Sequence, residues 1–278
     1  MPEVAPESAM DRGHALVASL AETWNSMRSV CLELDDAAWT TPTACPGWDV
    51  HDNVAHILGI EQMLEGDALP EVALADELEH VKNDFGRINE MWVESYRSVS
   101  HAELMSAFDS VTKRRLDRFG ALDAAGFVAP SWTPQGEGTV LDLLPFRIFD
   151  AWCHEQDIRE ATGRPGGWHT AAAALSVERM LNSLPYVVGK RAGMPEGFTI
   201  SFRLTGDQGC ERTVAVTGGR GSFVDASGNV DVTITMPTTA FMRYSLGRTA
   251  WTADTPEVQC SGDLDGASRV LQQLNVLF

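Results

Sequence analysis

The sequence predicts two domains, an all-α helix bundle over residues 1–167 and a smaller α+β domain with an antiparallel sheet over residues 168–278. Length is one reason, because a single hydrophobic core rarely grows beyond about 250 residues. The other reason is a change of period along the chain. Apolar residues recur every three or four positions in the first part, which is typical of amphipathic helices, and alternate with polar residues in short segments of the second, which is typical of strands.

The first domain is expected to begin with a helix over residues 11–34, whose apolar residues form one stripe. Later helices are expected from Val50, over 84–97, from His101 and from Val140. Three of these starts carry an N-cap residue with an acid three positions later. The pairs are Asp49 with Asp52, Ser100 with Glu103, and Thr139 with Asp142. Gly163 followed by Pro165 ends the last helix, and Pro145 is expected to bend its first turns.

The second domain is expected to open with a helix over residues 170–184. Three segments then alternate apolar and polar residues, as half-buried strands do. They read FTISFRL, TVAVT and VDVTITM, and begin at Phe198, Thr213 and Val230. Further helices are expected over 238–247 and 264–277.

Composition narrows the class of function. The formal net charge of -18, from 39 acidic and 21 basic side chains, disfavours binding to nucleic acid or to an anionic membrane. No stretch of about 20 apolar residues is present to span a bilayer, and the first residues lack the features of a secretory signal. We therefore expect a cytoplasmic protein, monomeric or homodimeric, whose partners are small molecules.

Cysteine and nucleotide chemistry receive little support. The five cysteines are scattered without a CxxC pair, which argues against a disulfide framework and a cysteine zinc site. Gly-rich phosphate loops and a GxSxG nucleophile motif are absent from the sequence. Cys45 is a candidate reactive thiol, although a free cysteine is more often a small buried apolar residue.

Two histidines stand out among the seven. His56 and His154 lie on or beside the apolar stripes of two helices, and Asp150 precedes His154 by one helical turn. Imidazoles that point into a bundle from facing helices, with a carboxylate nearby, suit a metal site, but hydrogen-bonded core histidines are the commoner case. The other five, at 14, 51, 80, 101 and 169, are interpreted as surface residues. Arg147 is expected to pair with an acid such as Asp52 across the bundle.

Two phrases carry a family resemblance. TPTACPGWDVHDNVAHILGIE, from Thr41, and LLPFRIFDAWCHEQDIREATGRPG, from Leu143, together resemble the mycothiol-dependent maleylpyruvate isomerase family. The resemblance spans essentially the whole chain. It implies a DinB-like four-helix bundle that binds metal, followed by a C-terminal domain similar to sterol carrier proteins.

The resemblance also implies site residues. The family's metal ligands, histidine, glutamate and histidine, fall on His56, Asp150 and His154, so that an aspartate replaces the glutamate. Asp157 and Arg159 are expected beside the site. Arg248 matches a frequent family phrase in the second domain and is expected to act in catalysis by binding an anion.

The implied function is that of a zinc-dependent enzyme, or one using another divalent metal, with mycothiol as the thiol cosubstrate. It would act on a small electrophile bound between the domains, as a cis-trans isomerase of the maleylpyruvate type or as a thiol S-transferase. Because the aspartate shortens one ligand, the alternative is a non-catalytic small-molecule-binding protein that retains the fold with altered metal ligation.

Overall fold

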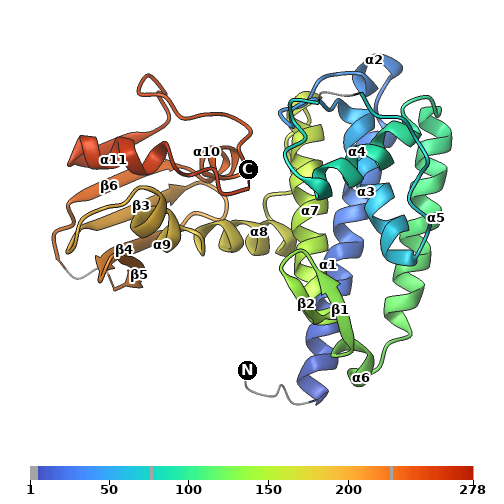
Figure 1. The fold of residues 1–278 in the computed structure, drawn as a ribbon, viewed down its shortest axis with the longest axis horizontal. Helices are drawn as coiled ribbons and strands as arrows, with labels where there is room; N and C mark the ends of the chain where they lie inside the picture. Colours follow the sequence, from blue (N-terminus) through green and yellow to red (C-terminus); the bar gives the residue numbers. More distant parts are fainter. Residues whose placement is uncertain (1–5, 76–77, 226–227, 278) are drawn as a thin grey trace. The chain divides into compact units, whose positions relative to one another are not determined.

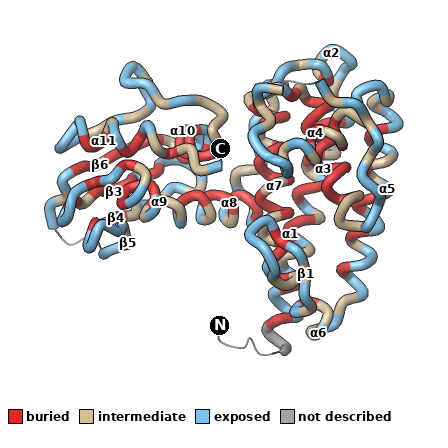
Figure 2. Tube along the Cα trace, in the orientation of Figure 1, coloured by how far each residue is buried: buried red, intermediate tan, exposed pale blue. Residues whose placement is uncertain are grey.

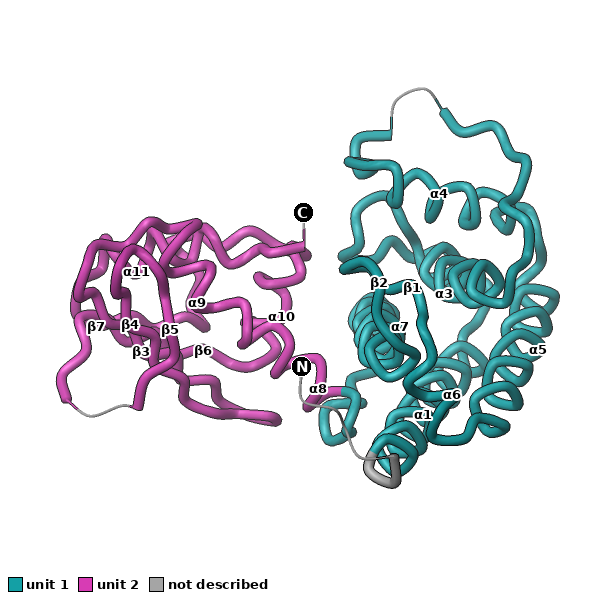
Figure 3. Tube along the Cα trace, turned by 60° about the horizontal axis from the view of Figure 1, so that its bottom comes forward, with its two compact units in different colours: residues 1–172 teal, residues 173–278 magenta. Residues whose placement is uncertain are grey.

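The computed structural model describes residues 6–75, 78–225 and 228–277 (Figure 1). The chain divides into two compact units, Met1–Ala172 and Ala173–Phe278 (Figure 3). The boundary predicted from the sequence, between residues 167 and 168, lies slightly earlier. The first unit is mainly helical and the second contains a five-stranded sheet, so the predicted fold class is confirmed.

Four long helices build the first unit. Helix α1 packs against α7 and α5, and α3 packs against α7 and α5, which closes the bundle. A further helix, α4, covers α3. The bounds are α1 (Pro6–Leu32), α3 (Val50–Glu65), α4 (Asp84–Tyr96), α5 (His101–Gly120) and α7 (Val140–Ala161), with short helices α2 (Asp36–Trp39) and α6 (Ala124–Phe127) between them.

The three predicted N-caps are confirmed, whereas α1 begins at Pro6 and ends at Leu32, earlier at both ends than the predicted range 11–34. The Asp49 side chain accepts a hydrogen bond from the backbone N–H of Asp52, and the Asp52 side chain accepts one in return from the N–H of Asp49. The same reciprocal pattern begins α5 and α7. These caps satisfy backbone donors that the first helical turn leaves without partners. Local sequence therefore fixes where the site-bearing helices α3 and α7 begin.

The core of the bundle lies along the predicted stripes. On α1, the buried residues include Leu20, Trp24 and Met27, and α3 is buried from Val50 to Glu61 (Figure 2). The segment before α7, where only a break was expected, forms a hairpin of β1 (Pro130–Thr133) and β2 (Gly136–Thr139). None of the described helices is both long and apolar enough to cross a bilayer.

The second unit is built on a sheet with strand order β5-β4-β3-β6-β7. Its neighbouring strands are antiparallel except β3 and β6, which run parallel with Ile200 opposite Val232. After the edge strand β5, the chain re-enters the sheet on the far side of β3, and there β6 runs in the same direction as β3. The bounds are β3 (Thr199–Thr205), β4 (Glu211–Thr217), β5 (Arg220–Val224), β6 (Val232–Pro237) and β7 (Gln259–Gly262).

The second unit also contains helices. The segment predicted as one helix over 170–184 is α8, which ends at Leu181, and two short helical turns follow it. The last predicted helix ends at Leu271, earlier than expected. The bounds are α8 (Ala171–Leu181), α9 (Leu184–Tyr186), η1 (Val187–Arg191, a π-helix), α10 (Thr238–Ser245) and α11 (Leu264–Leu271).

Candidate metal centre

Three side chains from α3 and α7 meet inside the bundle. His56 Nε2 lies 3.5 Å from Asp150 Oδ1, and His154 Nε2 lies 3.7 Å from the same oxygen. The potential ligand atoms of the three residues all lie within 4.8 Å of one another. His56 and His154 are buried, and Asp150 is half-buried. The residues named from the sequence are therefore brought together by the fold.

Helix geometry accounts for the convergence. Asp150 and His154 are one turn apart on α7 and share a face, while His56 faces them from α3. The two imidazole rings lie 4.7 Å apart between centroids in an edge-to-face arrangement. The indole of Trp48, at the end of the loop before α3, packs against both rings at 4.9 and 5.8 Å. The indole thus forms one wall of the site.

The spacing of these groups suits ligands of one ion better than partners in a hydrogen bond. Separations of 3.4 to 3.7 Å between His nitrogen and Asp oxygen are long for a charge-assisted hydrogen bond. Two ligands that each sit about 2.0 to 2.1 Å from a tetrahedral zinc ion are roughly 3.4 Å apart. Two imidazoles and a carboxylate are also a donor set that zinc takes in catalytic sites. The residues present therefore fit a divalent metal.

Burial and neighbouring charges shift the pKa values of the carboxylate of Asp150 and the imidazole of His56. Burial acts to raise the pKa of Asp150, but His56 and Arg147 outweigh it and hold that pKa well below its ordinary range. Burial lowers the pKa of His56, and the neighbouring Asp150 offsets only part of this effect. The site thus favours a carboxylate at 150 and a neutral imidazole at 56, which are the forms that bind metal.

Arg147 reaches a different acid from the one expected. Its Nε donates to Glu61 Oε1 at 2.7 Å and its Nη1 donates to Asp150 Oδ2 at 2.9 Å. Asp52 is instead contacted by Arg97 Nε at 3.2 Å. The predicted Arg147–Asp52 pair was wrong, because the early part of α7 that carries Arg147 lies beside Glu61, toward the end of α3. The start of α3 lies instead beside His154 and near the end of α4.

A second group of possible ligands shares His154. Cys45, His154 and Asp157 are all buried, with ligand atoms within 4.8 Å of one another. Asp157 Oδ2 lies 3.4 Å from His154 Nδ1, the nitrogen that faces away from Asp150. That same nitrogen is 2.7 Å from Asn53 Oδ1 and is already hydrogen-bonded. We therefore interpret these residues as groups that hold the His154 ring in place, and not as a second set of metal ligands.

The comparisons place the chain among known proteins. The profile described as the mycothiol maleylpyruvate isomerase N-terminal domain matches residues 7–159, and the one described as the MDMPI C-terminal domain matches residues 169–269. The chain belongs to the mycothiol maleylpyruvate isomerase family. No curated protein sequence matches it.

Solved structures agree with this family in fold. A crystal structure of the mycothiol-dependent maleylpyruvate isomerase aligns with a TM-score of 0.53 and 14% identity, over 90% of this chain and 92% of that one. A histidine-to-alanine mutant of that isomerase aligns with a TM-score of 0.52 at the same identity and coverage. At this identity the likeness concerns the fold.

Other residues named from the sequence lie apart from the three ligands in their contacts. Arg159 donates from Nε to Glu155 at 2.7 Å and from Nη2 to Ser26 at 3.0 Å, and so ties α7 to α1. Arg248 follows α10 in the second unit and is half-buried. Its part in anion binding stays a prediction.

His51 was predicted at the surface, and that prediction was wrong. Only 6% of the residue is exposed, and its Nε2 lies 2.9 Å from the backbone oxygen of Tyr96. The rings of Trp39 and His101 pack beside it. The start of α3 is covered here by the ends of neighbouring helices, which a single-helix pattern does not reveal.

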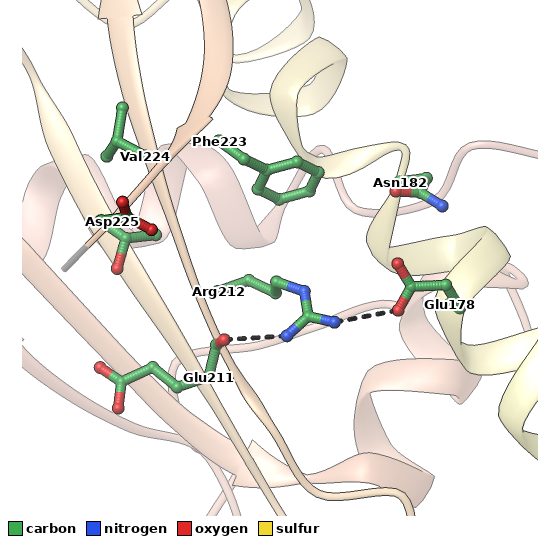
Figure 4. Close-up of a pocket in the computed structure, with 8 residues that line it drawn as sticks. Glu178, Asn182, Glu211, Arg212, Phe223, Val224 and Asp225 are labelled. Carbon is green, nitrogen blue, oxygen red and sulfur yellow. Dashed lines mark hydrogen bonds and ion pairs between the residues drawn. The ribbon is translucent and has the colours of Figure 1, made fainter.

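The second unit carries a cavity of about 720 Å³ between α8 and strands β4 and β5 (Figure 4). Arg212 Nη2 donates to Glu178 at 3.1 Å across it, and the phenyl ring of Phe223 forms part of its wall. Two further acids, Glu211 and Asp225, line it. Its one lining cation, among the described residues, is already paired, so it is a weaker candidate than the triad of His56, Asp150 and His154.

Proposed function

We propose that this chain is a metal-dependent enzyme that uses mycothiol to act on a small electrophile, as an isomerase of the maleylpyruvate type or as a thiol S-transferase. The observation that carries the proposal is the meeting of two imidazole nitrogens at Asp150 Oδ1, at 3.5 and 3.7 Å. Family membership supports the thiol and the reaction class, because the family is named for both.

The metal, zinc or another divalent ion, would be held by His56, Asp150 and His154. When bound, such an ion lowers the pKa of a thiol that ligates it and so supplies a nucleophile at neutral pH. Three protein ligands leave room for a further ligand, as in other catalytic zinc sites. The shorter aspartate is compatible with this role, since its Oδ1 lies near both imidazoles.

The protein residues around the site have distinct tasks. Arg147 holds Asp150 Oδ2 and so fixes the direction of the carboxylate. The Trp48 indole covers the two imidazoles and keeps water from that side. Its Nε1 donates to the buried Glu90 at 2.9 Å, which holds the indole in place. The site is thereby rigid before a thiol arrives, which favours reaction by fixing its geometry.

The two reaction outcomes differ only in a late step. In the isomerase, the thiol adds to the cis double bond, the resulting single bond rotates, and elimination of the same thiol restores the double bond in the trans form. In an S-transferase that acts by addition, the carbanion left by attack of the thiolate takes up a proton, and the carbon–sulfur bond persists. The chemistry required of the triad is the same for both, namely delivery of a thiolate.

Metal analysis and product analysis test the proposal together. Protein purified without chelator is expected to hold about one zinc per chain and to convert maleylpyruvate, or to form a sulfur conjugate with a model electrophile, only when mycothiol is present. His56→Ala should lose both metal and activity. His14→Ala is the control, because His14 is exposed on α1 and contacts Phe127 instead of the triad.

Two negative results would have different meanings. Protein that takes up no metal even after zinc is added, yet binds a small molecule, would show the alternative, a binding protein that kept the fold. Protein that holds zinc but changes no electrophile with mycothiol would contradict the reaction and leave the metal site standing.

A further inference from the structure

The side-chain amide of Asn53 is held on three sides. Asn53 is fully buried on the first turn of α3. Its Nδ2 lies 2.7 Å from the backbone oxygen of Asp49 and 3.0 Å from Thr43 Oγ1, and its Oδ1 lies 2.7 Å from His154 Nδ1. The amide thus connects the loop before α3 to a proposed metal ligand on α7.

Hydrogen bonding decides which way round the amide sits. The backbone oxygen of Asp49 can only accept, so the atom facing it must be the NH₂ group. The Thr43 hydroxyl gives its proton to the backbone oxygen of Trp48 at 2.8 Å, and so it too accepts from Asn53. A flipped amide would set its oxygen against both acceptors. The group that faces His154 is therefore the carbonyl oxygen.

This orientation determines the tautomer of His154. An amide oxygen is an acceptor only, so Nδ1 of His154 must carry the hydrogen. In the neutral ring, Nε2 then has the lone pair, and Nε2 is the nitrogen that faces Asp150 Oδ1. Asp157 Oδ2, at 3.4 Å from Nδ1, is another acceptor on the same side but lies farther away.

The loop that precedes α3 makes this arrangement rigid. The backbone N–H of Thr43 donates to the oxygen of Trp48 at 3.0 Å, and the N–H of Val50 donates to the oxygen of Thr41 at 3.2 Å. The loop is closed on itself from Thr41 to Val50, and the capping box of Asp49 joins it to the helix. The Asn53 amide is therefore held by hydrogen bonds to Thr43 and Asp49, two residues of this closed loop.

We propose that Asn53 is a positioning residue that fixes His154 as the Nδ1–H tautomer and thereby presents the Nε2 lone pair to the metal site. The inference rests on the proposed function only in the use of that lone pair. The tautomer itself belongs to the metal-free protein. A hydrogen-bond acceptor behind a ligating histidine commonly sets ring orientation and affinity in this way, and its loss costs about 10 to 100-fold in metal affinity.

The first experiment reads the tautomer directly. Protein labelled with ¹⁵N-histidine is freed of metal and studied by long-range ¹H–¹⁵N correlation at about pH 8, where an ordinary imidazole is neutral. The His154 signals are assigned from their absence in His154→Gln. We expect the Nδ1–H pattern in the wild type and a mixture with Nε2–H in Asn53→Leu.

The second experiment measures zinc affinity by competition with a chromophoric chelator. Asn53→Leu should bind zinc about 10 to 100-fold more weakly than the wild type. Asn89→Leu is the matched control, because it makes the same change on α4, at a half-buried position whose Oδ1 has no hydrogen-bond partner among the described residues. It should alter neither tautomer nor affinity. Should Asn53→Leu fail to give a helical circular dichroism spectrum, Asn53→Ala carries both measurements.

The outcomes separate this inference from the proposed function. An Nε2–H or doubly protonated His154 in the metal-free wild type overturns the inference, as does an unchanged tautomer or zinc affinity in Asn53→Leu. Absence of zinc binding by the wild type overturns the proposed metal enzyme instead, and the tautomer measurement still decides the role of Asn53.

Discussion

Arg147 and Asp150 are joined through Nη1 and Oδ2 at 2.9 Å, one turn apart on α7. Oδ1 lies 3.5 Å from His56 Nε2 and 3.7 Å from His154 Nε2, whereas Oδ2 lies 3.4 Å from His56 Nε2 and also accepts the hydrogen bond from Arg147. Because Oδ2 is already bonded to the guanidinium, Oδ1 has more capacity left for a further ligand. A metal in this site is expected to meet Asp150 through a single oxygen.

The first prediction concerns variants of Asp150. As a direct ligand, Asp150 should be as important as a histidine, so Asp150→Ala should weaken zinc binding about as much as His154→Ala. Asp150→Glu should retain binding, because 28% of the side chain is exposed and a longer acid has space to adjust. Chelator competition measures both. Asp117→Ala, at an exposed acid of α5, is the control. A loss of only about 10 to 100-fold in Asp150→Ala would place the carboxylate behind a ligand and not on the metal.

The second prediction concerns the buried Glu61. Its carboxylate accepts from Arg147 Nε at 2.7 Å and from Arg115 Nε at 2.8 Å, with all three residues buried. Glu61→Gln removes the buried charge that both guanidinium groups share and leaves Arg147 with Asp150 and Arg115 with Glu65. Breaking a buried pair typically costs about 3 to 5 kcal/mol, which is the upper limit expected here. Guanidinium denaturation followed by tryptophan fluorescence reports mainly the first unit, which holds every tryptophan except Trp251.

The control for that measurement is Asp117→Asn, whose partner Lys113 lies on the exposed face of α5. Its effect on the free energy of unfolding should be far smaller, since exposed ion pairs contribute little. Equal effects of the two substitutions would contradict a structural role for the buried cluster.

The third prediction is a pH dependence at Glu90. Burial alone would raise the pKa of Glu90, but hydrogen bonds from His80 and Trp48 outweigh it and hold that pKa below the ordinary value of 4.5. The unfolded state then takes up the proton first as the pH falls. Stability from Glu90 is therefore complete above about pH 4.5 and is lost as the pH drops through the folded pKa.

Glu90→Gln removes this contribution. The difference in unfolding free energy between wild type and Glu90→Gln should be largest at neutral pH and shrink toward about pH 3.5, as urea denaturation at several pH values would show. Asn89→Leu, which changes a group on the same helix that carries no charge, should give a difference that does not vary with pH. A difference for Glu90→Gln that stayed constant across the range would argue against the lowered pKa.

The fourth prediction concerns thiol reactivity. Cys31, Cys45 and Cys153 are buried, and burial raises the pKa of Cys31 to about 12. A thiol reagent should therefore label the half-buried Cys210 and Cys260 first in the native protein, and all five after denaturation. Mass spectrometry of a labelling time course measures the order. Rapid native labelling of Cys45 would revive its interpretation as a reactive thiol.

Local signals were the part of the fold that could be predicted. The starts of α3, α5 and α7 follow from side chains that bond to backbone three residues away, and such contacts need no knowledge of the rest of the chain. The hairpin of β1 and β2 and the two edge strands of the sheet, β5 and β7, escaped prediction. Their residues are largely exposed, and alternation reveals a strand only where one face is buried.

Part of the candidate site could likewise be predicted from the sequence, and part of it could not. Position and spacing on the helices singled out His56, Asp150 and His154, and the family resemblance gave them the role of metal ligands. The partner of Arg147 was missed because it depends on how far α7 is shifted along α3, and one sequence does not specify that register. The part played by Asn53 was missed for another reason. It needs the closed loop from Thr41 to Val50, whose hydrogen bonds are between groups that any sequence offers.

The three residues of the triad are synthesised at different times. His56 belongs to the second long helix of the chain and its companions to the last of the bundle, 94 residues later for Asp150. During synthesis, α3 leaves the ribosome before α7 has been made. At that stage Glu61 lacks its partner Arg147, and Asn53 lacks its partner His154. The bundle is completed only when residue 161 has emerged. Until residue 154 has emerged, the nascent chain contains only one imidazole of the proposed site, so we expect any metal to bind after the bundle has formed.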